Sequence, residues 1–371
     1  MKKEYPPIKI RVCEPDLSNL EIEYVTEAIK NNYVSGFAPP VKRFEKEFAE
    51  KFGMKHAIAV NSGGSALFIV LKALGVKEGD EVIMPSFTMV ASPAAASHCG
   101  AIPVFVDSSE QSFNMDPKKI EEKITPRTKA IMPVHIYGEP CDMDPIMEIA
   151  KKHNLHVVED AAEIHGAKYK GKMAGTFGIA GCFSLFANKI ISSGEGGVIL
   201  TNDDSLANAL NHMKSYDFND DMHFWHKTVA FNLRYPALNA ALGSAQLKRF
   251  DELVGKRRTN AQYYINGLKD VPGLTLFPEK PDTFSVFWMF GLLAPKRDEL
   301  MDFLAENGIE TRTFFIPMHR QPVYQHLQKD ERFPWADHYG DNGLYLPSSS
   351  QLTSEQKDEV VGKIKEFYQK A

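Results

Sequence analysis

The sequence predicts an α/β fold, with a mostly parallel sheet in a large domain and a smaller α/β domain after it. Short apolar runs alternate with helical stretches between about residues 56 and 160, as in proteins with parallel sheets. Polar residues follow several of these runs, at the strand ends where open α/β sheets bind ligands. The composition changes near Gly255, which predicts a large domain over residues 1–250 and a small one over 251–371.

The composition is that of an ordinary globular protein, with 43% hydrophobic and 25% charged residues. A net charge of −5 argues against a nucleic-acid partner, and no apolar run is long enough to predict a membrane partner. Prolines stand where a signal peptide would be apolar, so we expect a cytoplasmic protein. The four cysteines have no CxxC or CxH spacing, which predicts reduced thiols and no metal site.

Apolar periodicity predicts the helices that flank the sheet. A helix begins near Asn19 and carries apolar residues on one side: Leu20, Ile22, Val25 and Ile29. A loop over 33–40 separates it from a helix opened by Pro40, whose aromatic stripe is expected in the core. Further on, the pattern predicts one long helix over 237–268, strands over 274–277 and 285–294, and a helix over 296–307.

One lysine lies between two apolar runs that predict a strand, an exposed turn and a second strand. The runs cover 182–186 and 198–200, and Lys189 lies in the turn between them. The return is rich in glycine, including Gly194 and Gly197, which permit positive φ and close backbone approach. The turn can therefore present the amine to a molecule bound above the sheet. Taken alone, a lysine here is better explained as a solvated surface charge, and the rest of the chain has to supply the evidence against that interpretation.

Asp160 lies at the carboxyl end of the preceding predicted strand. Pyridoxal phosphate chemistry needs such a pair, because a lysine amine forms a Schiff base with the cofactor and a carboxylate keeps its pyridine nitrogen protonated. Taken alone, Asp160 is explained as a helix cap or a turn residue. The pair predicts pyridoxal 5'-phosphate as the cofactor, with Lys189 and Asp160 as catalytic residues.

A glycine-rich turn at 61–66 joins an apolar run at 56–60 to an apolar helix. Such a turn offers unpaired backbone amides and the positive end of a helix dipole, which together favour a phosphate group. Many α/β turns have this composition, so the pattern alone does not identify a phosphate site.

Three motifs in this order resemble the DegT/DnrJ/StrS family of sugar aminotransferases. They are VEDAAEIHGA at 158–167, FSLFANK followed by GEGG within 183–197, and NLR followed by AALG within 232–243. The resemblance extends from about Val12 to the C-terminus. It implies the fold type I architecture of aspartate aminotransferase, with a mostly parallel seven-stranded sheet, and pyridoxal phosphate as the cofactor.

The resemblance also implies which residues contact the cofactor. Met89 occupies a position where the family usually has an aromatic residue that stacks on the pyridine ring. Either the Met89 sulfur or the nearby Phe87 would have to hold the ring. The family often has threonine where Gly64 stands, so one hydroxyl contact must come from Ser65 or be missing. The residues assigned to the cofactor phosphate are Gly63, Gly64, Ser65 and Ser184.

Two further assignments concern the ring hydroxyl and the subunit interface. Glu163 is implied to lie beside the cofactor's ring hydroxyl, whereas an ordinary surface carboxylate is the alternative. Asn232 or Arg234 is implied to reach into the neighbouring subunit's site and contact the phosphate, whereas a helix-capping loop is the alternative. The resemblance therefore predicts a homodimer with shared active sites.

Candidate substrate contacts lie in two segments. Ser35 and Gly36 belong to a loop that is near the active site in the family, although a plain turn explains them as well. Residues 309–319 resemble perosamine-synthase-like members, and there Arg312 and His319 are candidate contacts to the sugar or its phosphates. A structural histidine is the alternative for His319.

The implied activity is transfer of an amino group from glutamate to a keto sugar, for cell-surface polysaccharide or a related glycan. A nucleotide-linked 4-keto-6-deoxy sugar is the expected acceptor. The departures at Gly64 and Met89 leave two other acceptors open, a 3-keto nucleotide sugar and a keto sugar without a nucleotide. A regulatory protein that binds the cofactor without turnover is the more distant alternative.

Overall fold

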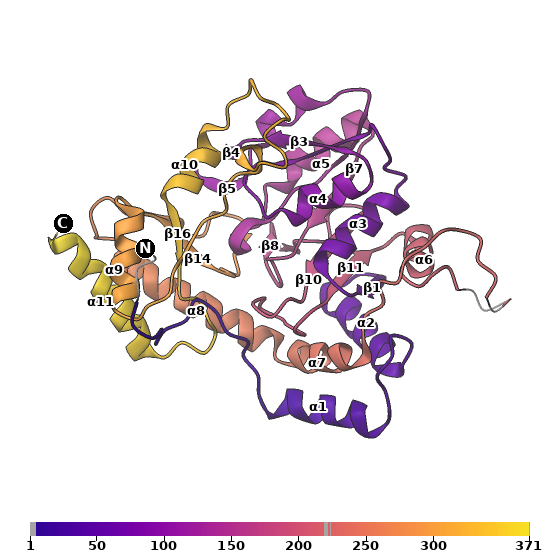
Figure 1. The fold of residues 1–371 in the computed structure, drawn as a ribbon, viewed down its shortest axis with the longest axis horizontal. Helices are drawn as coiled ribbons and strands as arrows, with labels where there is room; N and C mark the ends of the chain where they lie inside the picture. The colour runs from indigo at the N-terminus through magenta and orange to yellow at the C-terminus, as the bar shows by residue number, and fades with distance from the viewer. Residues whose placement is uncertain (1–4, 219–221, 223, 371) are drawn as a thin grey trace.

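The computed structural model describes residues 5–218, 222 and 224–370, and a seven-stranded sheet forms the centre of its larger part (Figure 1). From one edge to the other, the strands are β1 (His56–Val60), β11 (Gly197–Thr201), β10 (Ala180–Ser184), β7 (His156–Asp160), β6 (Thr128–Ile131), β2 (Glu81–Pro85) and β3 (Ile102–Val106). β11 runs antiparallel to both of its neighbours, and the other pairs are parallel. The prediction of a mostly parallel seven-stranded sheet is confirmed.

Helices cover both faces of this sheet. They are α2 (Pro39–Phe52), α3 (Gly63–Ala73), α4 (Ala91–His98), α5 (Met143–His153) and α6 (Asp204–Met213). Farther from the sheet, α7 (Ala237–Lys248) packs on α2, and α1 (Asn19–Lys30) packs on α7. Val82 and Met84 of β2 join one apolar cluster and Ile83 joins another, and neighbours along a strand point to opposite faces. α3 packs on β10 and β11 in the first cluster, whereas α5 packs on β6 and β7 in the second.

A smaller α/β part follows, built on a second sheet beside the first (Figure 1). Its strands, in sheet order, are β12 (Thr275–Leu276), β14 (Phe290–Leu293), β16 (Gly343–Leu346) and β15 (Arg312–Thr313). Its helices are α8 (Phe250–Leu268), α9 (Arg297–Glu306), α10 (Pro334–Asn342) and α11 (Ser354–Lys370). α8 joins the two parts, because Phe250 and Leu253 pack in the large core while Tyr264 and Leu268 pack in the small one. The boundary at residue 250 stays a prediction.

Short elements complete the chain. The remaining strands are β4 (Ser108–Ser109), β5 (Ser112–Met115), β8 (Lys168–Tyr169), β9 (Lys172–Met173) and β13 (Thr283–Phe284). The single 3-10 turns are η1 (Pro117–Lys119), η2 (Glu121–Lys123), η3 (Ile136–Gly138) and η4 (Met318–Arg320).

Two predictions from periodicity are wrong in part. The predicted long helix breaks at Arg249 into α7 and α8, and the Arg249 guanidinium at this bend pairs with Asp16 and Glu21. The strand predicted over 285–294 forms only in its second half, as β14. α1 has the predicted bounds, but Ile22 and Ile29 on its apolar side are 64% and 56% exposed.

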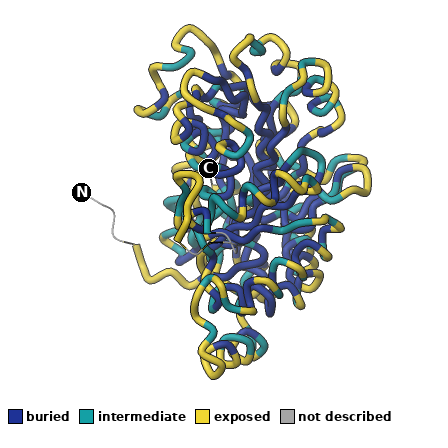
Figure 2. The backbone as a smooth tube through the Cα atoms, turned by 90° about the vertical axis from the view of Figure 1, so that its right-hand side faces the viewer, coloured by how far each residue is buried: buried dark blue, intermediate teal, exposed yellow. Residues whose placement is uncertain are grey.

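Burial is concentrated in the strands and in the helices packed on them, while α1 is largely exposed at the lower end of the view in Figure 2. No helix in the described ranges has both the length and the apolar character needed to cross a bilayer. The same residues contain no group of three or more His, Cys, Asp and Glu side chains that could hold a metal ion.

Candidate active site

Lys189 lies in the connection between β10 and β11, as predicted, but its side chain is not exposed. Only 10% of it is accessible to solvent. Nζ lies 3.7 Å from Oε1 of Glu163 and 3.7 Å from the centre of the Trp288 ring. The predicted exposed turn is therefore wrong for this side chain, because Glu163 and Trp288 enclose it on two sides.

Asp160 is the last residue of β7, beside β10, and both strands end at the same edge of the sheet. Its carboxylate is buried and accepts hydrogen bonds from Ser92 Oγ at 2.7 Å and from the Ala162 amide at 3.1 Å. Burial raises the pKa of Asp160, and these two donors and the charge of Lys189 oppose that rise. The structure thus brings the two predicted catalytic residues into one charged site.

Glu163 completes this charged group. Its Oε2 accepts a hydrogen bond from the Tyr137 amide at 2.8 Å. Burial raises the pKa of Glu163 to about 7, although the nearby Lys189 ammonium opposes the rise. Burial lowers the pKa of Lys189, while the charges of Glu163 and Asp160 oppose that fall. A buried amine and a buried carboxyl whose pKa values converge are suited to exchanging a proton near neutral pH.

The predicted phosphate residues meet at the N-terminus of α3. Ser62 caps the helix by accepting the Ser65 amide at 3.1 Å. A Cβ added to Gly63 would lie 2.9 Å from Cβ of Ser184, so the first turn of α3 contacts the end of β10 directly. Helix amides without intrahelical partners and a serine hydroxyl therefore lie side by side, as an anion site requires.

Met89 follows β2 on the segment that also carries Ser92, the partner of Asp160. Its side chain is 50% exposed, and its sulfur accepts the Ala91 amide at 3.0 Å. Phe87 is fully buried among aromatic rings that include Phe113 and Tyr137. Of the two candidates for holding a ring, only Met89 has an exposed surface to offer.

A second group of predicted residues gathers around Arg234. Its guanidinium lies 5.1 Å from the Phe37 ring centre and 5.5 Å from that of Tyr216. A Cβ on Gly36 would lie 2.8 Å from Cβ of Arg234, so the loop with Ser35 and Gly36 packs directly on this arginine. Asn232 forms an isolated bridge with Ser215, whose hydroxyl also accepts a hydrogen bond from Arg234. Within the described part of the chain, no hydrogen bond or ion pair links this group to Lys189.

Arg312 and His319 have different surroundings. Arg312 is 58% exposed on β15, pairs with Glu310 and lies beside Tyr345, whose pKa responds to the charges of both Arg312 and Glu163. Both ring nitrogens of His319 have partners, Ser86 Oγ at 2.7 Å and Asp337 Oδ1 at 3.2 Å. Its ring also stacks on Phe333. Arg312 is open to a ligand, whereas His319 joins segments of its own subunit.

Three residues of the site were not predicted from the sequence: Ser92, Tyr137 and Trp288. Ser92 is 68 residues from Asp160 in the chain, and the Trp288 indole donates to the Asn188 carbonyl from 100 residues away. No local pattern marks such partners. A positive φ of 54° at Tyr137, beside a glycine, is a backbone feature that the Tyr137-Gly138 pair could have suggested.

A parallel sheet with a buried lysine and an aspartate at its carboxyl edge, beside a helix N-terminus, defines an α/β aminotransferase. A sequence profile of the DegT/DnrJ/EryC1/StrS aminotransferase family matches residues 15–365. The chain belongs to this family.

Individual relatives span nearly the whole chain. A GDP-perosamine synthase of Caulobacter vibrioides is 43% identical over 359 residues, covering 95% of this chain and 96% of that protein. A dTDP-3-amino-3,4,6-trideoxy-alpha-D-glucose transaminase of Streptomyces venezuelae is 38% identical over 332 residues, covering 89% and 87%. The crystal structure of S. venezuelae DesV matches with a TM-score of 0.93 at 34% identity, covering 99% of this chain and 100% of that one.

The free energy of unfolding of the Glu163→Gln variant should increase relative to that of the unaltered protein as the pH rises from 5 to about 8. Between pH 4.5, the ordinary pKa of a glutamate, and about 7, folded Glu163 keeps a proton that the unfolded chain has released. The folded state loses stability across that window, on the order of 2 kcal/mol, and glutamine removes the loss. Urea unfolding of the cofactor-free proteins at several pH values measures the difference. A difference that does not change with pH would contradict the raised pKa of Glu163.

Proposed function

We propose that this protein is a pyridoxal phosphate-dependent aminotransferase that converts a nucleotide-linked 4-keto-6-deoxy sugar to an amino sugar. Glutamate is the proposed amino donor, and cell-surface polysaccharide or a related glycan is the proposed destination, with the cytoplasm as the proposed location. The observation that carries the proposal is the buried amine of Lys189, which lies 3.7 Å from Glu163 and responds to the charge of Asp160. The sugar is proposed from the GDP-perosamine synthase relative and from the similar segment at 309–319.

The residues present fit pyridoxal phosphate. The amides of the first turn of α3 and the Ser184 hydroxyl would hold the phosphate, and Asp160 would face the pyridine nitrogen. Met89 would cover one side of the ring through its sulfur. When bound, the cofactor supplies an aldehyde that exchanges with amino groups and a ring that accepts electron density.

The protein's own groups supply proton transfer, orientation and a dry site. Lys189 would hold the cofactor through its amine and, when that amine is free, would accept or donate a proton at Nζ. Glu163 takes or returns a proton at Nζ, because its pKa of about 7 leaves both forms populated at neutral pH. Ser92 and the Ala162 amide hold the Asp160 carboxyl in place and oppose the rise of its pKa on burial, so that it would face the pyridine nitrogen and favour a proton there.

Arg312 is the proposed contact to a carboxylate or phosphate of the substrate. Arg312 lies beside Tyr345, and the pKa of Tyr345 responds to the charges of both Arg312 and Glu163, so Arg312 is close to the charged site. Its planar guanidinium can bind two oxygens of a carboxylate or phosphate at once. We also propose substrate contacts at Ser35, Gly36 and His319. The loop with Ser35 and Gly36 packs on Arg234, and the ring of His319 has partners within its own subunit.

We also propose a homodimer in which Arg234 acts on the partner's site. Large apolar side chains are exposed on α1 and on the segments that flank it, and a second subunit would cover them. They are Leu17, Ile22, Ile29, Val34 and Phe37. Arg234 packs on Phe37 at this surface, and no carboxylate pairs with it among the described residues. An anionic group of the partner's ligand would supply the missing charge.

The dimer proposal predicts complementation between two inactive variants. Lys189→Ala and Arg234→Ala should each have little activity, whereas their mixed dimers contain one site with both changes and one with neither. Random reassortment should therefore restore about a quarter of the wild-type activity. A mixture of Lys189→Ala with Asp160→Asn should recover nothing, because both residues belong to the same chain's site. Equal recovery in both mixtures, or none in either, would contradict a role for Arg234 across the interface.

The proposed chemistry is tested by visible absorption of the purified protein with pyridoxal phosphate, before and after glutamate. We expect an absorption band that depends on Lys189 and that glutamate removes, with Lys189→Ala as the control. A panel of keto sugars should then restore the band, and product analysis identifies the acceptor. If no band forms, or if it ignores every amino donor, the aminotransferase proposal fails and a regulatory role without turnover is favoured.

A 3-keto nucleotide sugar is the second candidate acceptor, favoured by the name of the Streptomyces venezuelae transaminase relative. The same panel separates the two acceptors, because a 3-keto and a 4-keto sugar would restore the band at different rates. A keto sugar without a nucleotide belongs in the panel for the same reason.

Gly63→Ala should weaken pyridoxal phosphate binding by about tenfold or more, because the added methyl would lie 2.9 Å from Cβ of Ser184 and overpacking costs about 1–3 kcal/mol. Gly64→Ala is the matched control on the same helix turn, where the nearest atom to an added Cβ is Ser62 Oγ at 3.9 Å. Titration of the visible band with cofactor measures both affinities. Equal affinities for the two variants would argue against a phosphate at this turn.

A further inference from the structure

Trp288 lies directly over the amine of Lys189, although it belongs to the smaller part of the chain. The ammonium nitrogen is 3.7 Å from the ring centre, well inside the range of a cation–π contact. The side chain of Trp288 is 4% exposed, so water does not weaken the contact. The indole and Glu163 therefore hold Nζ from two sides.

We propose that the Trp288 indole face holds Lys189 whenever its amine is not attached to the cofactor, and so sets the position and the charge of the waiting amine. The proposal rests on the proposed role of Lys189 in attaching the cofactor. The indole ring holds the amine while the amine is charged. The amine becomes able to react again once Glu163 has taken its proton.

The indole is fixed by the same turn that carries the lysine. Its Nε1 donates to the carbonyl of Asn188 at 2.7 Å, so ring and lysine are positioned by adjacent residues. The Arg257 guanidinium, itself buried, donates to the Trp288 carbonyl at 3.1 Å. Trp288 is thus held at its indole nitrogen and at its backbone.

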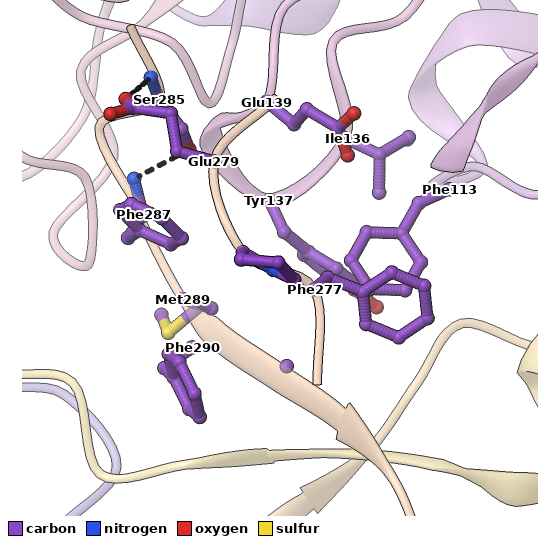
Figure 3. Close-up of a pocket in the computed structure, with 12 residues that line it drawn as sticks. Phe113, Ile136, Tyr137, Glu139, Phe277, Glu279, Ser285, Phe287, Met289 and Phe290 are labelled. Atoms are coloured by element: carbon purple, nitrogen blue, oxygen red, sulfur yellow. Dashed lines mark hydrogen bonds between the residues drawn. The ribbon is translucent and has the colours of Figure 1, made fainter. Parts of the chain in front are cut away.

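The segment before Trp288 is docked on the turn at Tyr137. Val286 N and Ser285 Oγ both donate to the Gly138 carbonyl at 3.0 Å. Figure 3 shows Ser285 and Phe287 on this segment, with Glu279 accepting the Ser285 amide and Tyr137 on the other side of the pocket. A Cβ on Gly138 would lie 2.5 Å from Trp288 N, so only glycine permits this approach. The turn that donates to Glu163 therefore also places Trp288.

The charge of Lys189 depends on every titratable group around it. Asp160 ends β7 and Glu163 lies three residues further on, whereas Cys13 comes from the N-terminal segment, where its Sγ lies 3.4 Å from the Asn188 carbonyl oxygen. His165 also feels the charge of Lys189. The Trp288 indole presents its ring face to the amine at 3.7 Å, and this contact favours the ammonium over the free amine.

The test measures the charge of Lys189 in the cofactor-free protein. The rate at which an amine-reactive acylating reagent labels Lys189, followed by peptide mass spectrometry over a range of pH, gives the apparent pKa of the amine. Trp288→Leu removes the ring face and should lower that apparent pKa by about one unit. Trp288→Phe keeps a ring face and should stay close to the unaltered protein. Trp335→Leu is the control for losing an indole elsewhere, since Trp335 packs on Tyr339.

An unchanged apparent pKa in Trp288→Leu would overturn the proposal. An equal shift in Trp288→Phe and Trp288→Leu would also overturn it, because the hydrogen bond to Asn188 and not the ring face would then be responsible. Neither outcome tests the proposed function, because the labelling is done without the cofactor. If the unaltered protein forms no visible band with pyridoxal phosphate, the proposed function fails whatever the labelling shows.

Discussion

A primary amine buried at the carboxyl edge of a parallel sheet is the constraint on which the rest of this site depends. Burial disfavours the charged form of Lys189, and the uncharged form is the one that the proposed chemistry requires. Asp160, Glu163 and the Trp288 ring each restore part of the charged form's stability. The balance between them keeps the amine able to gain and lose a proton.

The sheet topology makes this balance possible. β7 and β10 are parallel neighbours, so their carboxyl ends deliver Asp160 and the Lys189 turn to the same edge. β11 then returns antiparallel, and its first residue, Gly197, leaves no room for a side chain, because a Cβ there would lie 2.4 Å from the Ser62 carbonyl oxygen. That close approach holds the N-terminus of α3 against the strand ends, next to the amine.

The sequence predicted the parts of this site that depend on strand ends and turns. Lys189, Asp160 and Gly63 follow apolar runs whose order along the chain indicated a parallel sheet, and parallel strand ends meet at one edge. Ser92 and Trp288 could not be predicted in the same way, because their contacts join segments 68 and 100 residues apart.

The exposed side of α1 shows another limit of periodicity. The apolar spacing correctly predicted a helix, but the chain itself leaves Ile22 and Ile29 largely uncovered, at 64% and 56% exposed. An apolar stripe on a helix indicates that another surface covers it. It does not indicate whether that surface belongs to the same chain or to another. The exposed stripe with Ile22 and Ile29 supports the proposed homodimer, in which a second subunit covers it.

Borohydride reduction after incubation with pyridoxal phosphate, followed by peptide mass spectrometry, tests the central claim most directly. We predict that a phosphopyridoxyl group is found on the peptide containing Lys189, and that prior treatment with glutamate removes it because the cofactor then carries the amino group. Labelling of other lysines with none at Lys189, or labelling at Lys189 that glutamate does not change, would contradict the claim.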